Sequence, residues 1–208
     1  MLYRLSQEQL AATLMPLGGL SKQEVRKIAE QEGIPVASKR DSQEICFVPD
    51  GDYAGYIEAN ANGNIPGEGD FVDETGNRLG KHKGIIHYTV GQRKGLGLAM
   101  GDPVYVQKIR PETDEVVVGD ESSLYRNNII CGDLNFMSIP DLPEGEVLEC
   151  RAKVRYHHSP QEAAVEAVGP DRVRVSFVSP VRAPAPGQSA VFYDRDDNVI
   201  GGGIILET

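Results

Sequence analysis

Apolar residues recur with helical spacing in the first part of the chain. Ser6 and Ser21 each stand three positions ahead of a Gln or Glu, which is the capping-box pattern that begins a helix. After Ser21, the apolar residues Val25, Ile28 and Ala29 fall on one helical face. The first 60 residues are therefore predicted to be mainly helical. A short extended run is expected at 44–48 and a last short helix at 53–59.

From about residue 64 the pattern changes to short β-type runs separated by Gly, Pro and Asx residues. Turn signals at roughly 8 to 12 residue spacing are typical of barrels and sandwiches, not of βαβ units. The pattern predicts an α+β chain with a helical segment at 1–60, a small β domain at 61–126 and a second β unit at 127–208. The candidate strands are 104–109, 115–118, 128–133, 146–155, 162–167, 172–177, 189–193 and 199–205, with a hairpin turn at 73–77 and loops at 140–143 and 180–186.

Composition narrows the class of protein. The chain has 208 residues, 40% of them hydrophobic and 25% charged, which is typical of a folded globular protein. No apolar run approaches the roughly 18 residues that span a bilayer, and the start lacks the apolar block of a secretory signal. The three cysteines form no C-x-x-C pair and are too few for a disulfide framework. We therefore expect a cytoplasmic protein without a membrane partner.

The net charge of −10 is distributed unevenly, and its sign alone argues against nucleic acid. Three windows, 78–101, 151–161 and 172–193, contain 11 basic residues and no acid, so the remainder carries −21. Chance segregation with solvated faces is one interpretation. A basic face for a polyanion is the other.

Cys46 is the first candidate for chemistry. It stands in Asp-Ser-Gln-Glu-Ile-Cys-Phe, where a strand would place Ile45 and Phe47 on one face and the thiol on the other. Lys39 and Arg40 favour a thiolate and the neighbouring acids oppose it. A buried, inert thiol is the alternative, and it suits Cys131 and Cys150 better.

The histidines do not predict a metal site. The nearest spacing, from His82 to His87, has no cysteine pair to complete a tetrahedral zinc site. We expect no metal in this chain.

A glycine-rich basic segment, Gly-Gln-Arg-Lys-Gly-Leu-Gly at 91–97, is the densest unusual motif. Glycines permit sharp turns and close approach, while Arg93 and Lys94 supply cations for a phosphate. The order is neither a Walker A loop nor G-x-G-x-x-G. A cradle for RNA made with Gln92, Arg93 and Lys94 is the functional interpretation, and a solvated hairpin is the alternative.

Basic and apolar residues alternate from Arg151 to Arg155, so that a strand would place Arg151, Lys153 and Arg155 in one row suited to a phosphate backbone. Tyr156 follows and could stack on an unpaired base. Gln188 enters a later strand, where its amide could bond a base edge. A polar outer strand is the alternative interpretation of the row.

Four motifs in this order, Asp-Ser-Gln-Glu-Ile-Cys-Phe, His-Tyr-Thr-Val-Gly-Gln-Arg-Lys-Gly-Leu-Gly, Pro-Gly-Gln-Ser-Ala-Val and Gly-Gly-Gly-Ile-Ile, resemble the bacterial tRNA-specific 2-thiouridylases. The resemblance covers essentially the whole chain. It implies that 127–208 is a C-terminal antiparallel β-barrel like those of translation factors.

The resemblance implies an enzyme that forms 2-thiouridine at wobble position 34 of tRNA. ATP adenylates the C2 oxygen, and a cysteine persulfide displaces AMP. Cys46 matches the persulfide-bearing cysteine, while Arg155, Tyr156 and Gln188 match positions that contact tRNA. The implied partners are the tRNA anticodon arm and a sulfur-relay donor protein.

One part of the family pattern has no counterpart in this sequence: the N-terminal Ser-Gly-Gly-x-Asp-Ser pyrophosphate loop and the other catalytic cysteine. We therefore expect the C-terminal portion of such an enzyme, with ATP bound mainly by the missing domain and with no activity on its own. A non-catalytic RNA-binding β-barrel module that acts with a separate enzyme is the rival hypothesis. A barrel that serves only protein contacts is the third.

Overall fold

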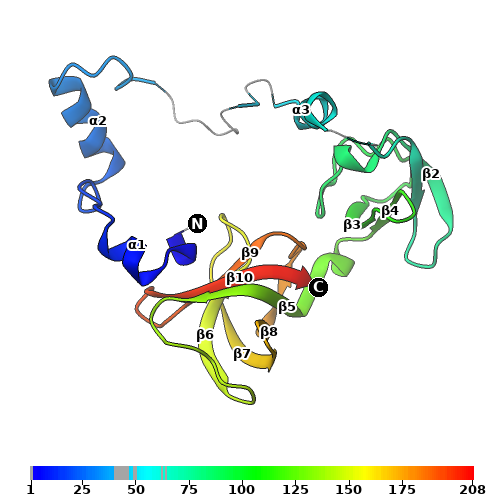
Figure 1. Cartoon of the computed structure of the whole chain (residues 1–208). Coiled ribbons are helices and arrows are strands. Elements are labelled where there is room, and N and C mark those ends of the chain that lie inside the picture. Colours follow the sequence, from blue (N-terminus) through cyan, green and yellow to red (C-terminus); the bar gives the residue numbers. More distant parts are fainter. Residues whose placement is uncertain (1, 40–46, 49–50, 62, 64) are drawn as a thin grey trace. The chain divides into compact units, whose positions relative to one another are not determined.

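The computed structural model describes residues 2–39, 47–48, 51–61, 63 and 65–208, which belong to two compact units (Figure 1). One unit is Glu8–Asn62, and the other joins Met1–Gln7 to Gly63–Thr208. Short helices in the first unit and ten strands in the second confirm the predicted α+β class. The predicted domain boundaries at 60 and 126 stay predictions.

The Glu8–Asn62 unit is built from short capped helices. At Ser21, Oγ accepts a hydrogen bond from the Glu24 amide at 3.3 Å, and the Glu24 carboxylate accepts one from the Ser21 amide at 2.7 Å. This capping box confirms the helix predicted after Ser21. Asp52 caps the short helix predicted at 53–59 by accepting from the Gly55 amide at 3.0 Å. The helices are α1 (Gln7–Ala11), α2 (Lys22–Gln31) and α3 (Tyr53–Asn60).

Most of the extended run expected at 44–48 lies outside the described residues, and so does Cys46. Its last two residues are not in a strand, because Phe47 lies in a turn and Val48 in irregular backbone. Val48 is buried and Phe47 is exposed against the ring of Tyr56, with centroids 5.2 Å apart.

A four-stranded sheet of order β2-β1-β4-β3 follows. β1 pairs parallel with β4, whereas β1 with β2 and β3 with β4 pair antiparallel. Phe71, Val106 and Val116 are fully buried in its core. The hairpin turn predicted at 73–77 joins the first two strands and is confirmed by the bond from the Asp73 amide to the Asn77 carbonyl at 3.0 Å. The elements are β1 (Gly69–Val72), β2 (Arg78–His82), η2 (Ile85–His87), β3 (Tyr105–Arg110), β4 (Glu115–Gly119) and η3 (Ser122–Leu124).

The remaining strands close into a barrel of order β10-β5-β8-β7-β6-β9, in which neighbouring strands pair antiparallel (Figure 1). Alternate residues point inward, as Ala163, Val165 and Ala167 do in β7. The barrel implied by the family resemblance is thus confirmed. Its strands are β5 (Tyr125–Phe136), β6 (Val147–Lys153), β7 (Gln161–Gly169), β8 (Arg172–Arg182), β9 (Ser189–Tyr193) and β10 (Val199–Glu207).

The loop predicted at 180–186 begins later than expected, because β8 continues to Arg182. Arg126 pairs with Val181 and Asn128 with Ser176, so a bulge in β8 spans Pro180. A bulge tolerates the missing N–H of proline, and this explains how the strand passes through a residue that usually ends one.

The first residues of the chain belong to the barrel. Tyr3, in the 3-10 helix η1 (Leu2–Arg4), is 1% exposed, and its hydroxyl bonds Ser189 Oγ at 3.0 Å. Asn135 donates to the Tyr3 carbonyl, and Arg4 pairs with Asp133. A side chain at Gly202 would lie 2.8 Å from the Tyr3 ring, so the glycine of β10 makes room for the tyrosine.

Candidate functional site

The glycine-rich basic loop is braced by its own glutamine. Gln92 Oε1 accepts from the Thr89 amide at 3.0 Å, and Gln92 Nε2 donates to the Lys94 carbonyl at 2.9 Å. Gly91, Gly95 and Gly97 all have positive φ, which glycine adopts without strain. Arg93 and Lys94 are exposed, and within the described part of the chain no hydrogen bond or ion pair holds their side chains. The loop thus presents two cations, while Gln92 shapes it.

The guanidinium of Arg155 donates hydrogen bonds to backbone carbonyls. Its Nε and Nη2 donate to the Ala183 carbonyl at 3.0 and 2.7 Å, and Nη2 also donates to the Val90 carbonyl at 3.0 Å. Val90 precedes the basic loop and Ala183 follows β8, so Arg155 joins the loop to the barrel. Burial and the charge of Arg182 lower the pKa of Arg155 from its ordinary value.

The predicted row of Arg151, Lys153 and Arg155 is not a row of free cations. The strand ends at Lys153, and Arg155 turns to the junction described above. Arg151 Nη2 donates to the Asp194 carbonyl at 2.7 Å and to the Asp197 carboxylate at 2.9 Å. Of the three, Lys153 alone has no hydrogen bond or ion pair among the described residues, and its Nζ lies 5.6 Å from the ring centroid of Tyr156.

Tyr156 is 86% exposed, which is unusual for an aromatic side chain. Its ring meets that of His157 edge to face, with centroids 4.9 Å apart and an interplanar angle of 81°. One face of an exposed ring beside Lys153 has the character of a stacking platform for a base.

Gln188 precedes β9, and its backbone carbonyl accepts from the Ile205 amide at 2.8 Å. Its side-chain oxygen is buried and finds no hydrogen-bond partner among the described residues. An unsatisfied buried amide oxygen is costly, but in this conformation the atom is closed to a ligand from solvent.

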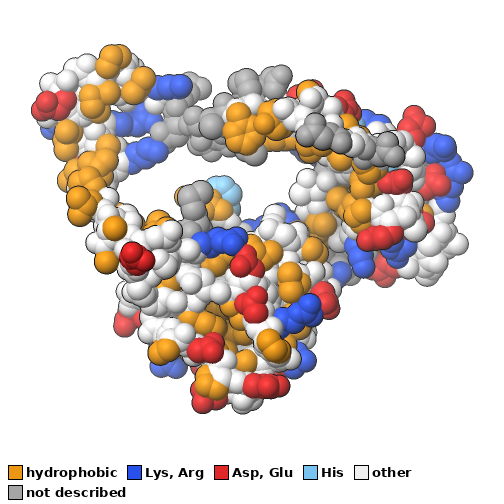
Figure 2. All heavy atoms as spheres, in the orientation of Figure 1, with side chains coloured by type: hydrophobic (Ala, Val, Ile, Leu, Met, Phe, Trp, Pro, Cys, Tyr) orange, Lys and Arg blue, Asp and Glu red, His pale blue; other side chains and the backbone are white. Residues whose placement is uncertain are grey.

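The acid-free windows of the sequence are not acid-free in space. Arg78 pairs with Asp70 at 2.8 Å, Arg174 with Glu166 at 3.0 Å and Arg182 with Glu121 at 3.3 Å. Blue and red side chains accordingly intermingle on the face shown in Figure 2. The predicted basic face therefore narrows to the cations without such pairs, above all Arg93, Lys94 and Lys153.

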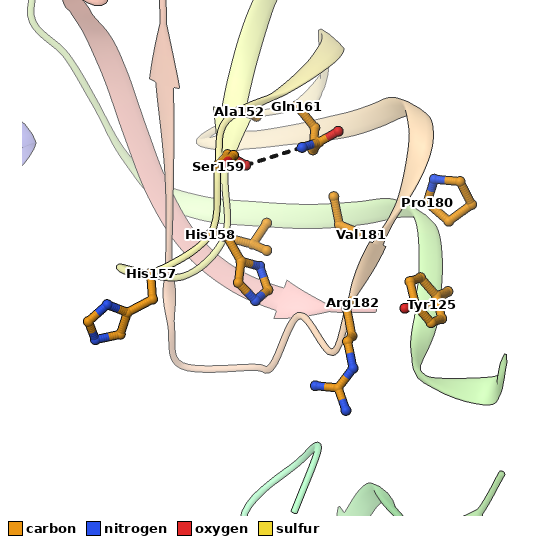
Figure 3. A pocket seen from close by; sticks show the side chains of 10 residues that line it. Tyr125, Ala152, His157, His158, Ser159, Gln161, Pro180, Val181 and Arg182 are labelled. Atoms are coloured by element: carbon orange, nitrogen blue, oxygen red, sulfur yellow. Dashed lines mark hydrogen bonds between the residues drawn. The ribbon is translucent and has the colours of Figure 1, made fainter. Parts of the chain in front are cut away.

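A hollow of about 410 Å³ opens on the barrel (Figure 3). Tyr125 from β5, Arg182 from β8 and His158 from the loop after β6 contribute to its wall. Of the three, Tyr125 lies outside every sequence motif, while Arg182 belongs to the acid-free window 172–193; strand pairing across the barrel brings them together. The adjacent histidines at 157 and 158 are the feature of the sequence that could have indicated this hollow.

The two described thiols are unreactive by environment. Burial raises the pKa of Cys131 to about 12, and burial with the charges of Glu149 and Glu162 raises that of Cys150 to about 12. Both are free cysteines in the barrel core. Both therefore match the buried, inert thiols that the sequence indicated for these two positions.

No group of three or more His, Cys, Asp or Glu side chains suited to a metal ion occurs among the described residues. His82 is buried and has a structural role, since Nε2 lies 2.9 Å from the Asp114 carbonyl and Nδ1 accepts from the Gly84 amide. No helix in the described ranges is long and apolar enough to cross a membrane.

Three family models match consecutive parts of the chain. They are the tRNA methyl transferase HUP domain at residues 1–50, the tRNA methyl transferase PRC-barrel domain at 60–120 and the aminomethyltransferase β-barrel domain at 126–205.

Curated relatives match nearly the whole chain. It is 49% identical over 206 residues to the tRNA-specific 2-thiouridylase MnmA of Lachnoclostridium phytofermentans, covering 99% of this chain and 57% of that protein. The proteins of the same name from Clostridium perfringens and Acetivibrio thermocellus are each 52% identical, with 98% of this chain and 56% of the relative covered. The chain thus spans somewhat more than half the length of these relatives.

Proposed function

Because the chain belongs to the tRNA-specific 2-thiouridylase family, as a C-terminal portion, we propose that it is the tRNA-docking and sulfur-carrying part of an enzyme that forms 2-thiouridine at wobble position 34. The anticodon arm of tRNA is the proposed RNA partner. A sulfur-relay protein is the proposed donor, and the cytoplasm is the proposed location.

The observation that carries the docking proposal is Tyr156, an aromatic ring exposed to solvent beside Lys153. Base stacking on such a ring with nearby cations is how proteins commonly engage unpaired RNA. Arg93 and Lys94 add two unpaired cations. The RNA contact of Gln188 rests on the motif that it shares with the family. Arg155 contributes mainly by holding the loop against the barrel.

We assign sulfur transfer to Cys46 on the motif that it shares with the family. The uridine C2 oxygen attacks the α-phosphorus of ATP and pyrophosphate leaves. The terminal sulfur of a Cys46 persulfide then attacks C2, and AMP departs with the oxygen. A second thiol must finally cleave the sulfur–sulfur bond and form a disulfide with Cys46. Cys131 and Cys150 are too deeply buried for this step, so it falls to a cysteine elsewhere in the enzyme.

ATP use is assigned mainly to the family's pyrophosphate-loop domain, whose motif this sequence lacks. The chain alone is therefore expected not to adenylate tRNA.

Binding of fluorescent tRNA by the full chain tests the docking role. A stacked base contributes about 1 to 3 kcal/mol, so Tyr156→Leu should weaken binding about 5- to 150-fold. Tyr156→Phe keeps the ring and is the matched control, expected within about twofold of the parent. If Tyr156→Leu and the parent bound tRNA with equal affinity, stacking on Tyr156 would not be part of tRNA docking.

Sulfur loading tests Cys46. The chain is incubated with a cysteine desulfurase, a sulfur-relay protein and radiolabelled cysteine, and label that a reductant releases is counted. Cys46→Ser should abolish loading, whereas Cys131→Ser and Cys150→Ser should keep it. Normal tRNA binding without loading on the parent chain would favour the non-catalytic RNA-binding module.

A further inference from the structure

We propose that the hollow beside Tyr156 holds one unpaired nucleotide of the RNA, with its base against Tyr125 and its phosphate toward Arg182 and His158. This inference rests on the proposed RNA-docking function and gives it a second contact point on the barrel.

The size and floor of the hollow suit a nucleotide. Its volume of about 410 Å³ lies within the roughly 300 to 1,000 Å³ of ordinary small-molecule sites. Ala152 from β6, Val154 just after that strand and Val181 from β8, all buried, form an apolar floor. An apolar floor favours the flat face of a base over a hydrated ion.

The wall provides an aromatic ring and an amide. Tyr125 begins β5 and is 43% exposed, so its ring is available from the solvent side. Gln161 begins β7, and its Nε2 lies 3.4 Å from the Ser159 carbonyl, which is the dashed line in Figure 3. This bond is long, and the amide retains capacity for the edge of a base.

The wall also carries positive charge and no acid among the described residues that line it. His158 and Arg182 both contribute side chains there (Figure 3). Burial lowers the pKa of His158, and the charges of Arg155, Arg182 and Lys153 lower it further. Three cations therefore act on this imidazole, which marks a positive potential that a phosphate would relieve. Glu121, just before η3, pairs with Arg182 at 3.3 Å and offsets only part of this positive potential.

Together the apolar floor, the ring, the amide and the cations match a base joined to a phosphate. An acidic peptide would use the cations but leave the floor and Tyr125 without a planar partner. The nucleotide therefore accounts for all four features.

Titration of the isotopically labelled full chain with uridine 5′-monophosphate tests the site, with amide shifts as the readout. The expected result is saturable shifts at Tyr125, His158 and Gln161, with affinity at least about tenfold above that of inorganic phosphate or of uridine. Equal affinity for inorganic phosphate would reduce the site to an anion site and overturn the proposal. Equal effects from a poly-glutamate peptide, or shifts confined to the loop at 91–97, would overturn it too.

Binding of an anticodon stem-loop RNA separates this inference from the proposed function. Tyr125→Leu and His158→Gln should each weaken binding about 5- to 50-fold. Arg172→Gln removes an exposed charge from the far end of β8 and should have little effect. If the parent binds the RNA and both pocket variants bind it equally well, the nucleotide site is wrong while the docking function stands. If the parent does not bind the RNA, the docking function fails.

Discussion

Replacing Arg155 with methionine should destabilise the junction between the basic loop and the barrel. The side chain donates three hydrogen bonds to two carbonyls, those of Ala183 and Val90. Hydrogen bonds from charged donors contribute about 1.5 to 3 kcal/mol. Arg155 is half-buried and water replaces part of this interaction, so we expect a total loss of about 2 to 3 kcal/mol.

The junction also contains a residue in a strained backbone conformation. Ala183 has φ of 50°, a left-handed conformation that costs a non-glycine residue about 1 to 2 kcal/mol. The surrounding bonds hold it there: its amide donates to the Leu124 carbonyl at 2.8 Å, and its carbonyl receives Arg155. Removing the guanidinium takes away the hydrogen bonds that hold the carbonyl of Ala183.

Thermal and chemical denaturation measure the effect. A loss of about 2 to 3 kcal/mol should lower Tm by about 5 to 10 °C in a domain of this size. The Tm of Arg155→Lys should lie between those of the parent and Arg155→Met, because an ammonium keeps the charge but lacks the forked donors of the guanidinium. Arg172→Met is the matched control, with an expected change within about 0.5 kcal/mol.

The same variant also distinguishes two roles for Arg155. If Arg155→Met melts like the parent but lowers the salt dependence of tRNA binding by about one phosphate contact, the side chain binds RNA directly. The reasoning from the junction is then refuted.

Three further predictions concern single side chains. At pH 8 the native Cys46→Ser chain should not react with an aromatic disulfide reagent, whereas in denaturant both of its remaining thiols should react, because burial suppresses Cys131 and Cys150; reaction of the native variant would contradict this. Hydrogen bonds lower the pKa of Asp73 from 3.8 to about 2, so its contribution is present above pH 3.8 and lost as pH falls through about 2. The stability gap between Asp73→Asn and the parent should close over that range in acid unfolding, and a constant gap would exclude the linkage. Gly91→Ala should destabilise by about 1 to 2 kcal/mol, seen as a lower Tm, because φ is 87° and the new Cβ would lie 3.2 Å from a neighbouring methyl; an unchanged Tm would show that the loop shifts freely.

Local signals in the sequence predicted the elements well. The capping box at Ser21 and the hairpin turn at Asp73 depend on residues within four positions, and both occur as expected. The strand through Pro180 was missed because proline usually ends a strand. A bulge set by the pairing with β5 tolerates it, and the sequence of β8 alone does not contain that pairing.

The site was harder to predict because its charges find partners far along the chain. Arg151 bonds Asp194 and Asp197, which are 43 and 46 positions away, and Arg155 bonds Ala183 at 28 positions. The row looked free because its neighbours in sequence carry no acid. Tyr156 needed no long-range partner, and its exposure agrees with the platform expected from the sequence.

The packing of Tyr3 in the barrel fixes the chain just ahead of the Glu8–Asn62 unit. Both ends of the Glu8–Asn62 unit continue into the unit that contains the barrel, at Gln7 and at Gly63. Closing a chain segment at both ends restricts the volume that its residues sample. Removing the packing of Tyr3 would lengthen the connection on the N-terminal side and loosen that restriction.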